Sequence, residues 1–252
     1  MAVTYSSPED WAGRVVVVSG GSSGIGRAFV ERLSREGAHV IACGRSQVAL
    51  RQLQDSYPGV ETIRCDISVR DDVLALAAAI RERHGRLDVL INNAGIMQRV
   101  DLLDDSVDDD AVAHEIGVNL TGTIMLTPHC LSLLRMGRDP MVVTVTSGYA
   151  LLPATRAPIY SATKAALRSF TLSLRRQAAA AGIRVVEVLP PLVDTPATSA
   201  VTGRKMSAEA LVGRVLRDIG KGRDESLPGQ VGLLPILMRL VPKYIARRVA
   251  RS

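Results

Sequence analysis

The sequence contains few aromatic residues and no long uninterrupted apolar run. Phenylalanine, tryptophan and tyrosine make up 3% of its 252 residues, and no basic stretch is interleaved with them. Surfaces that stack nucleic-acid bases need such aromatics beside basic residues, so nucleic acid is not an expected partner. No apolar run reaches the roughly 20 residues that span a bilayer. Residues 1–11 contain acids and no apolar segment, so we expect no secretory signal peptide.

Cysteine is also scarce, and its spacing excludes the usual sulfur sites. The three cysteines, Cys43, Cys65 and Cys130, form no C-x-x-C pair and have no paired histidines nearby in the sequence. We therefore expect neither a disulfide framework nor a metal site. The net charge of +6 is spread among interspersed acids. Reduced thiols and the absence of a targeting segment predict a cytoplasmic protein.

Short β-branched runs alternate with segments long enough to form helices. The runs lie at residues 15–18, 40–41, 89–91, 142–145 and 184–188. They are apolar on both sides, as in strands of a buried parallel sheet. Helical spacing of apolar residues appears within residues 25–33, 73–80 and 167–174. The pattern predicts a doubly wound α/β fold of three layers, α/β/α, in a single domain over residues 1–252.

A glycine-rich turn follows the first predicted strand and opens the first predicted helix. Glycines there allow close backbone approach, and the helix N-terminus offers N–H groups to a pyrophosphate. An ordinary tight turn is the alternative, but the strand-to-helix context favours dinucleotide binding. The candidate residues are Gly20, Ser22, Ser23, Gly24, Ile25 and Gly26.

A basic residue follows the second predicted strand, at the position where an NAD-binding site has an acidic residue. Arg45 lies about twenty residues after the glycine-rich turn. An arginine suits a 2′-phosphate through charge-assisted hydrogen bonds, so NADP(H) is preferred over NAD(H). A solvated arginine at a helix start is the alternative interpretation.

Two further polar positions follow strands. Asp66 and Ile67 are candidate cofactor-binding residues, and Asp66 is placed to accept from an adenine amino group, or else to cap the next helix. Asn93, within the run Asn-Asn-Ala-Gly at residues 92–95, is placed to approach a cofactor ribose, or else to form a simple turn.

Tyr160 and Lys164 lie one helical turn apart, and Ser147, thirteen residues before Tyr160, follows the apolar stretch at residues 141–146. A free tyrosine has a pKa of about 10, so acid–base work near neutrality requires a neighbouring cation that favours the phenolate. This arrangement is able to hold a phenol, an ammonium and a hydroxyl around one carbonyl. Taken alone, the pair also fits a solvated face of an amphipathic helix.

Together, the glycine-rich turn, the run at residues 92–95, Asn119, Ser147, Tyr160 and Lys164 resemble the short-chain dehydrogenase/reductase family over residues 12–200. The resemblance implies a Rossmann-type fold, a nicotinamide cofactor and reversible hydride transfer between that cofactor and a carbonyl or alcohol. It also implies a homodimer or homotetramer built partly by the helices that carry Asn119 and Tyr160.

Carried over by position, the resemblance assigns a catalytic tetrad. Tyr160 is the catalytic acid and base, and Lys164 lowers its pKa and binds the nicotinamide ribose. Ser147 hydrogen-bonds the substrate oxygen. Asn119 kinks its helix and holds a proton-relay water.

Two departures from the family pattern stand out. Ser19 begins the glycine run where threonine is commoner, which keeps a hydroxyl. Two prolines, Pro190 and Pro191, replace the usual Pro-Gly after the sixth strand and stiffen that loop. Val193 and Thr195 still match the nicotinamide-contacting positions. The substrate stays open.

By the same resemblance, residues 148–153 belong to the substrate pocket, and residues 196–252 form its lid and a C-terminal extension. Their apolar side chains favour a hydrophobic ketone or secondary alcohol. The apolar run at residues 231–241 precedes four basic residues, Lys243, Arg247, Arg248 and Arg251. It is suited to an anionic membrane surface, to covering the pocket or to packing on a partner subunit.

The sequence therefore predicts an NADP(H)-dependent carbonyl reductase or alcohol dehydrogenase. One alternative is a membrane-associated reductase of a ketolipid. The other is a binding protein that senses dinucleotides without turnover.

Overall fold

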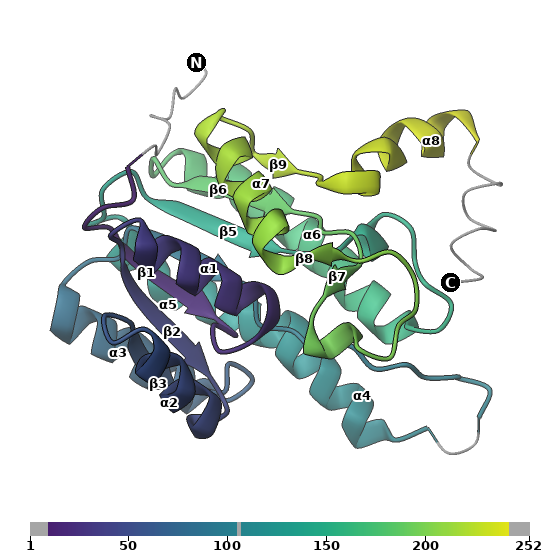
Figure 1. Cartoon of the computed structure of the whole chain (residues 1–252), viewed down its shortest axis with the longest axis horizontal. Coiled ribbons are helices and arrows are strands. Elements are labelled where there is room, and N and C mark those ends of the chain that lie inside the picture. Colours follow the sequence, from purple (N-terminus) through teal and green to yellow (C-terminus); the bar gives the residue numbers. More distant parts are fainter. Residues whose placement is uncertain (1–9, 105–106, 242–252) are drawn as a thin grey trace.

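Seven parallel strands form the central sheet of the protein (Figure 1). The computed structural model describes residues 10–104 and 107–241. The strand order is β3-β2-β1-β4-β5-β6-β9. The strands are β1 (Val15–Ser19), β2 (His39–Gly44), β3 (Glu61–Arg64), β4 (Val89–Asn92), β5 (Met141–Val145), β6 (Arg184–Val188) and β9 (Glu225–Ser226).

All residues of the four central strands, β1, β4, β5 and β6, are buried, on both faces of the sheet, as the apolar runs predict. In β1, Val16 and Val18 pack into one hydrophobic cluster, while Val15 and Val17 pack into the other. This division follows from the two-residue period of a strand, which points successive side chains to opposite faces. Both clusters are sealed by helices, so the sheet is the middle layer of three.

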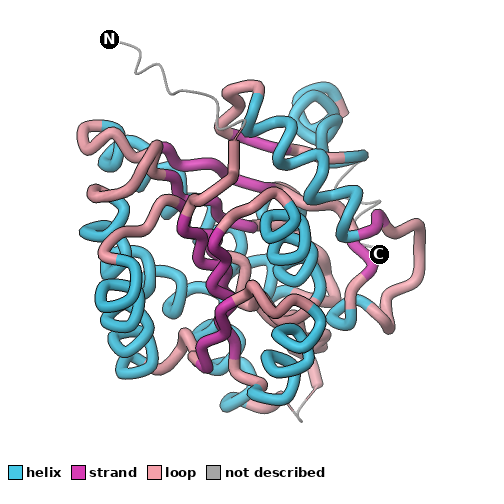
Figure 2. Tube along the Cα trace, turned by 60° about the vertical axis from the view of Figure 1, so that its left-hand side comes forward, coloured by secondary structure: helices cyan, strands magenta, loops and turns pink. Residues whose placement is uncertain are grey.

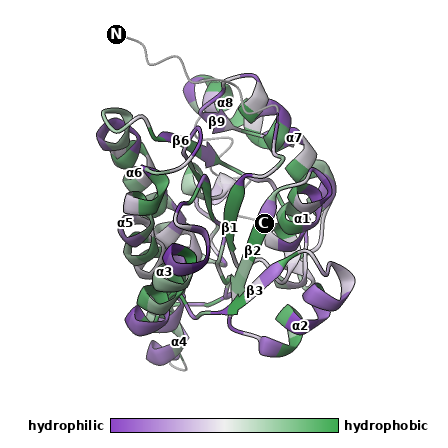
Figure 3. Ribbon diagram, turned by 90° about the vertical axis from the view of Figure 1, so that its left-hand side faces the viewer, coloured by the Kyte–Doolittle hydropathy of each residue, from purple (hydrophilic) through white to green (hydrophobic). Residues whose placement is uncertain are grey.

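Helices cover the two faces in separate groups (Figures 2 and 3). On one face lie α1 (Gly24–Arg35), α2 (Gln47–Ser56) and α7 (Ala208–Gly220). On the other lie α3 (Arg70–His84), α5 (Thr123–Leu134) and α6 (Pro158–Ala179). The predicted doubly wound, single-domain α/β/α fold is confirmed.

The order in which the chain adds strands to the sheet reverses at β1 and β4. It builds outward from β1 through β2 to β3, then crosses back so that β4 pairs with the other side of β1. In such sheets, ligands bind beyond the carboxyl ends of the strands at this switch point. The glycine-rich turn after β1 and the loop after β4 meet there.

A long helix that runs along the sheet contains an irregular segment. Asp108 caps α4 (Asp109–Ile116), because its Oδ1 accepts from the backbone N–H groups of Asp110 and Ala111 at 3.0 and 3.1 Å. A π-helical segment, Gly117–Gly122, then joins α4 to α5. A Cβ added at Gly122 would lie 2.7 Å from the carbonyl oxygen of the buried Ile67.

The C-terminal part of the chain folds over the carboxyl end of the sheet. It contains the short strands β7 (Val193–Asp194) and β8 (Met206–Ser207), 3₁₀ turns at Pro196–Thr198 and Gly229–Leu233, and helix α8 (Leu234–Leu240). The basic residues Lys243, Arg247, Arg248 and Arg251 lie outside the described residues. No helix within residues 10–104 and 107–241 is long and apolar enough to cross a membrane.

Candidate active site

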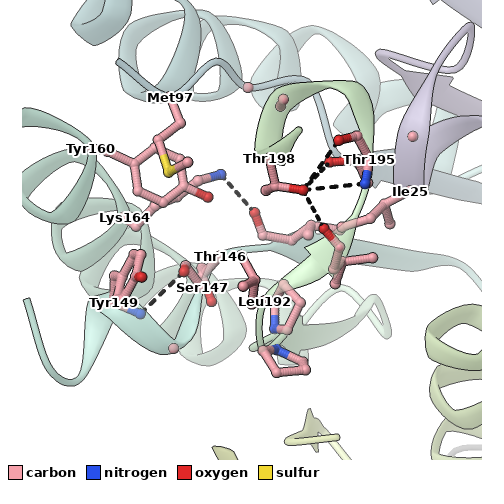
Figure 4. Close-up of a pocket in the computed structure, with 18 of the residues that line it drawn as sticks. Ile25, Met97, Thr146, Ser147, Tyr149, Tyr160, Lys164, Leu192, Thr195 and Thr198 are labelled. Atoms are coloured by element: carbon pink, nitrogen blue, oxygen red, sulfur yellow. Dashed lines mark hydrogen bonds between the residues drawn. The ribbon is translucent and has the colours of Figure 1, made fainter. Parts of the chain in front are cut away.

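A cavity of about 360 Å³ opens at the carboxyl ends of the strands (Figure 4). It brings together ten of the predicted site residues: Gly20, Ser23, Gly24, Ile25, Asn93, Ser147, Tyr160, Lys164, Val193 and Thr195. The other predicted residues, Ser22, Gly26, Arg45, Asp66, Ile67 and Asn119, do not line this cavity. Of these, Gly26 and Asn119 contact residues that line the cavity, Gly20 and Ile96.

The glycine-rich turn forms a cradle that side chains would fill. Gly20 and Gly24 have φ of +66° and +53°, which L side chains rarely adopt. A Cβ at Gly26 would lie 2.1 Å from the carbonyl oxygen of Gly20. Ser23 is the N-cap residue of α1, yet its side chain makes no capping bond to the first turn. The cradle and the helix N-terminus therefore fit a pyrophosphate group.

Hydrogen bonds tie this turn to the end of β4. The Ser19 hydroxyl accepts from the backbone N–H groups of Asn93 and Ala94 at 3.0 and 3.1 Å. The Asn93 amide donates to the carbonyl oxygen of Ser19 at 3.0 Å. Asn93 is thus more than a simple turn residue, because it fixes the glycine-rich turn and also lines the cavity. The serine at position 19 supplies the hydroxyl that this junction uses.

Three titratable residues, Arg45, Asp66 and His114, lie close together near the carboxyl ends of β2 and β3. Nη1 of Arg45 lies 2.7 Å from Nε2 of His114, which the sequence did not single out. Burial raises the pKa of Asp66, but hydrogen bonds from Ser68 and the charge of Arg45 outweigh it, so the pKa lies below its ordinary value. The N-cap residue of α3 is Val69, so the alternative that Asp66 caps this helix is wrong.

Ser147 follows β5 and faces the ring of Tyr160. The Ser147 hydroxyl accepts from the backbone N–H of Tyr149 at 3.1 Å and also hydrogen-bonds the Tyr160 side chain. The Tyr149 and Tyr160 rings meet edge to face, with centroids 6.3 Å apart. The phenol therefore lies against the Ser147 hydroxyl and the Tyr149 ring.

Lys164 is buried beside Tyr160, one turn further along α6. Its Nζ donates to the carbonyl oxygen of Val145 at 3.0 Å and lies 5.5 Å from the centroid of the Tyr160 ring. Burial lowers the pKa of Lys164 to about 8, although the charge of Glu115 raises it.

The expectation that Lys164 lowers the pKa of Tyr160 is not met in this structure. Burial raises the pKa of Tyr160 to about 12, while the hydrogen bond from Ser147 lowers it and the charge of Glu115 raises it. The physical reason is desolvation, which disfavours the phenolate and outweighs the other influences.

Asn119 lies in the π-helical segment and is fully buried. Its amide makes two hydrogen bonds of 2.8 Å with the backbone of Ile96, one to the N–H and one to the carbonyl oxygen. It also donates to the Thr163 hydroxyl at 3.2 Å. A Cβ added at Gly95 would lie 3.3 Å from Oδ1 of Asn119 and 3.4 Å from Nζ of Lys164. The loop after β4 is thus fixed against α6.

A buried ionic network that the sequence did not reveal supports the strand before Ser147. The Thr146 hydroxyl donates to the carboxylate of Glu187 at 2.7 Å, and Arg168 forms an ion pair with the same carboxylate. Burial raises the pKa of Glu187, and the Thr146 bond and the Arg168 charge oppose that rise. The network joins β5, β6 and α6, so Ser147 projects from a rigid support.

The far end of the cavity is apolar and is formed partly by the C-terminal segment. Its apolar lining includes Met97, Tyr149, Leu152, Leu192, Val231 and Leu234. Three interpretations of the apolar C-terminal run at residues 231–241 were given above. Val231 and Leu234, in its first turn, line the cavity, so this turn covers the pocket. Thr198 closes the loop beside Thr195, because its hydroxyl donates to the carbonyl oxygen of Val193 at 2.5 Å.

Comparison with known proteins agrees with this geometry. The uncharacterized oxidoreductase DltE of Bacillus subtilis is 35% identical over 220 residues, 83% of this chain and 86% of its own. The 11-beta-hydroxysteroid dehydrogenase A of Sesamum indicum is 30% identical over 250 residues, 97% of this chain and 66% of its own.

Two solved structures share the fold. A short chain dehydrogenase from Burkholderia cenocepacia in complex with NADP is 26% identical, with a TM-score of 0.85 over 95% of this chain and 98% of its own. A short chain dehydrogenase/reductase from Burkholderia phymatum in complex with NAD is 23% identical, with a TM-score of 0.84 over 96% of this chain and 98% of its own. A family model described as short chain dehydrogenase matches residues 14–205. The chain therefore belongs to the short-chain dehydrogenase family and is an oxidoreductase that acts on CH–OH groups.

Proposed function

We propose that this protein is an NADP(H)-dependent oxidoreductase that interconverts an apolar ketone and its secondary alcohol. The observation that carries the proposal is one cavity shared by the glycine-rich turn, Ser147, Tyr160 and Lys164. A dinucleotide held at the turn reaches, within that cavity, the hydroxyl, the phenol and the ammonium that carbonyl chemistry uses.

The proposed preference for NADP(H) rests on a basic residue, Arg45, at the part of the site that would bind the adenosine of the cofactor. Arg45 follows β2, at the position where an acid would favour NAD(H). Ser22 lies beside Gly44, the residue before Arg45, because a Cβ added at Gly44 would lie 3.3 Å from the Ser22 hydroxyl. The relative from Burkholderia cenocepacia was solved with NADP. Arg45, with His114 as its neighbour, is proposed to bind the 2′-phosphate.

The residues around Tyr160 divide the proton chemistry among them. A bound nicotinamide dinucleotide supplies the hydride in reduction and accepts it in oxidation. Tyr160 protonates the substrate oxygen during reduction, and Ser147 donates a hydrogen bond to the same oxygen. Lys164 places a positive charge 5.5 Å from the centre of the phenol ring. Lys164 is proposed to bind the nicotinamide ribose, while Asn119 fixes the loop that packs on Lys164.

The apolar end of the cavity selects the substrate. Leu152, Leu192 and Leu234 offer no charge to a ligand there, so burial of hydrocarbon provides the binding energy. Residues 196–206 flank the opening and are proposed to act as the lid. The C-terminal extension is proposed to complete the pocket wall through Val231.

Turnover assays test the proposal. Purified protein with NADPH is screened against apolar ketones of increasing size, and NADPH oxidation is followed by absorbance. Tyr160→Phe is the negative control, because it removes the proton donor and keeps the ring. Binding of NADPH without turnover of any ketone or alcohol would favour the alternative of a dinucleotide-sensing protein.

A second candidate function is supported by the outer face of the C-terminal segment. Leu233, Ile236 and Leu240 expose 57%, 58% and 73% of their surface beside Arg239. An exposed apolar face with a basic residue suits the interface of an anionic membrane, where a ketolipid substrate would be found. Co-sedimentation with anionic liposomes, compared between the wild type and a variant that carries Ile236→Glu and Leu240→Glu, tests this candidate.

The protein is also proposed to be a cytoplasmic homodimer or homotetramer. Ile116 and Ile124, on either side of the segment that carries Asn119, are more than one-third exposed and are available for packing between subunits. The three cysteines are buried and free, which suits a reducing compartment. Light scattering coupled to size-exclusion chromatography measures the oligomer size.

A further inference from the structure

One side chain, Arg168, binds carboxylates on two neighbouring strands. It lies one turn after Lys164 on α6, and its side chain is 23% exposed. Its Nη1 forms an ion pair with Oε2 of Glu187 on β6, and its Nη2 donates to Oε1 of Glu225 on β9 at 3.2 Å. A guanidinium presents its donors in a rigid fork, so Arg168 holds the two carboxylates in a fixed relation. Each carboxylate leads to a different wall of the substrate cavity.

The first wall is the end of β5, at Ser147. Glu187 is fully buried, and its Oε1 accepts from the Thr146 hydroxyl at 2.7 Å. Thr146 and Ser147 both line the cavity. A buried carboxylate has no water to replace a lost partner, so removal of Arg168 would leave an unpaired charge against Thr146. The position of Ser147 therefore depends on the pair that Arg168 and Glu187 form.

The second wall is formed by the chain that follows β9. This two-residue strand lies at the edge of the sheet beside β6, and the chain runs from it toward α8 (Figure 1). Its Ser226 side chain points away from α6 and donates to Asp218 on α7 at 2.7 Å. Val231, shortly after β9, lines the cavity and packs on Gly148, where an added Cβ would lie 3.1 Å from Cγ2 of Val231. The apolar wall beside Ser147 therefore depends on where β9 lies.

Arginine side chains hold the segment around β9. Arg175 on α6 donates to the carbonyl oxygen of Asp224 at 2.7 Å, and Arg184 on β6 donates to the Asp224 carboxylate at 3.0 Å. These two contacts place the residue that precedes β9. Arg168 differs from them because it binds β9 and also the buried carboxylate that supports the end of β5. It therefore links the two walls of the cavity.

We propose that Arg168 is a positioning residue that holds the Ser147 hydroxyl and the apolar wall at Val231 in register across the cavity. Arg168 does not line the cavity, so it acts through Glu187 and Glu225 rather than on the substrate. The substrate carbonyl must reach Ser147 while its hydrocarbon part packs on Val231, and Arg168 fixes both positions at once. The consequence for turnover rests on the proposed function, whereas the placement of β9 does not.

Hydrogen exchange tests the placement of β9 without a substrate. The backbone N–H groups of Glu187 and Leu189 donate to carbonyl oxygens at and just before β9, each at 2.9 Å, so local opening of β9 exposes them. Arg168→Met removes the guanidinium, while Arg168→Lys keeps a charge beside Glu187 but lacks the fork that holds two carboxylates. Both variants are expected to exchange these amides about tenfold faster, the effect of losing a charged hydrogen bond. Arg176→Met, at an exposed position of the same helix, is the matched control. Wild-type exchange in both Arg168 variants would overturn the inference.

Turnover per NADPH-binding site tests the consequence for the reaction, with the alkyl phenyl ketone that the wild type reduces fastest. Counting sites by fluorescence titration removes any loss of folded protein, which is all that a merely structural role would cause. Arg168→Met, or Arg168→Lys if the former does not fold, is expected to lower kcat/KM by up to about 100-fold, as a misplacement of about 1 Å does, at unchanged NADPH affinity. Glu225→Ala, which leaves the pair with Glu187 intact, is expected to raise KM and keep kcat. Wild-type kcat/KM per site in the Arg168 variants would overturn the role in the reaction. A wild type that reduces none of these ketones would contradict the proposed function, while faster exchange would still support the placement of β9.

Discussion

Replacement of Gly26 by alanine is predicted to break the glycine-rich turn. The added Cβ would lie 2.1 Å from the carbonyl oxygen of Gly20 and 2.5 Å from the Asn93 amide nitrogen. Carbon atoms in contact prefer separations of about 3.5–4.0 Å, so the turn must move by more than about 1 Å. Overpacking of this kind costs about 1–3 kcal/mol of folding free energy. In a chain of this size, each kcal/mol lowers Tm by roughly 2–4 °C.

The predicted loss of binding exceeds the loss of stability, because the displaced atoms belong to the phosphate cradle. A misplacement of about 1 Å at a site is able to cost about 100-fold, so we expect Gly26→Ala to bind NADPH at least that much more weakly. Fluorescence titration and thermal unfolding measure the two effects. Gly220→Ala is the control, since a Cβ there meets nothing within 4 Å. Wild-type affinity in folded Gly26→Ala would refute the reasoning.

Three further predictions concern the chemistry. Tyr160→Phe is expected to lower turnover by about 10²–10⁴-fold while NADPH affinity stays near the wild-type value; appreciable turnover would assign the proton to another group. Arg45→Ala is expected to weaken NADPH binding and to leave NADH binding unchanged. His114→Ala is expected to have the same effect to a smaller extent. Parallel titrations of each variant with NADPH and NADH measure the two affinities. Lys164 titrates near pH 8 when folded and near 10.5 when unfolded, so between these values the unfolded state binds more protons. The free energy of unfolding therefore gains up to ~1.4 kcal/mol per pH unit from this group, and urea unfolding of Lys164→Met between pH 8 and 10 is expected to lack that gain.

The central strands β1, β4, β5 and β6 were predictable because they are buried on both faces. The runs at residues 15–18 and 184–188 correspond to β1 and β6 within one residue, since continuous β-branched runs leave little choice of structure. Strand β9 is different. It contains only Glu225 and Ser226, and it pairs through backbone groups that no side-chain pattern reveals.

Spacing and family resemblance predict the tetrad, whereas no sequence pattern predicts its surroundings. The π-helical segment at Asn119 depends on contacts with Ile96 and Thr163 that join distant parts of the chain. Glu115 reads as an ordinary surface acid in sequence, and only the packing of α4 on α6 buries it. The raised pKa of Tyr160 likewise follows from burial, which a local motif does not encode.

Parallel fluorescence titrations with NADPH and NADH test the central claim most directly, because they require no knowledge of the substrate. The wild type is predicted to bind NADPH about tenfold or more tightly than NADH, since Arg45 adds a charge-assisted hydrogen bond to the 2′-phosphate. Tighter binding of NADH would contradict the assignment of Arg45. Binding of neither dinucleotide would contradict the account of the cavity as the active site of a nicotinamide-dependent oxidoreductase.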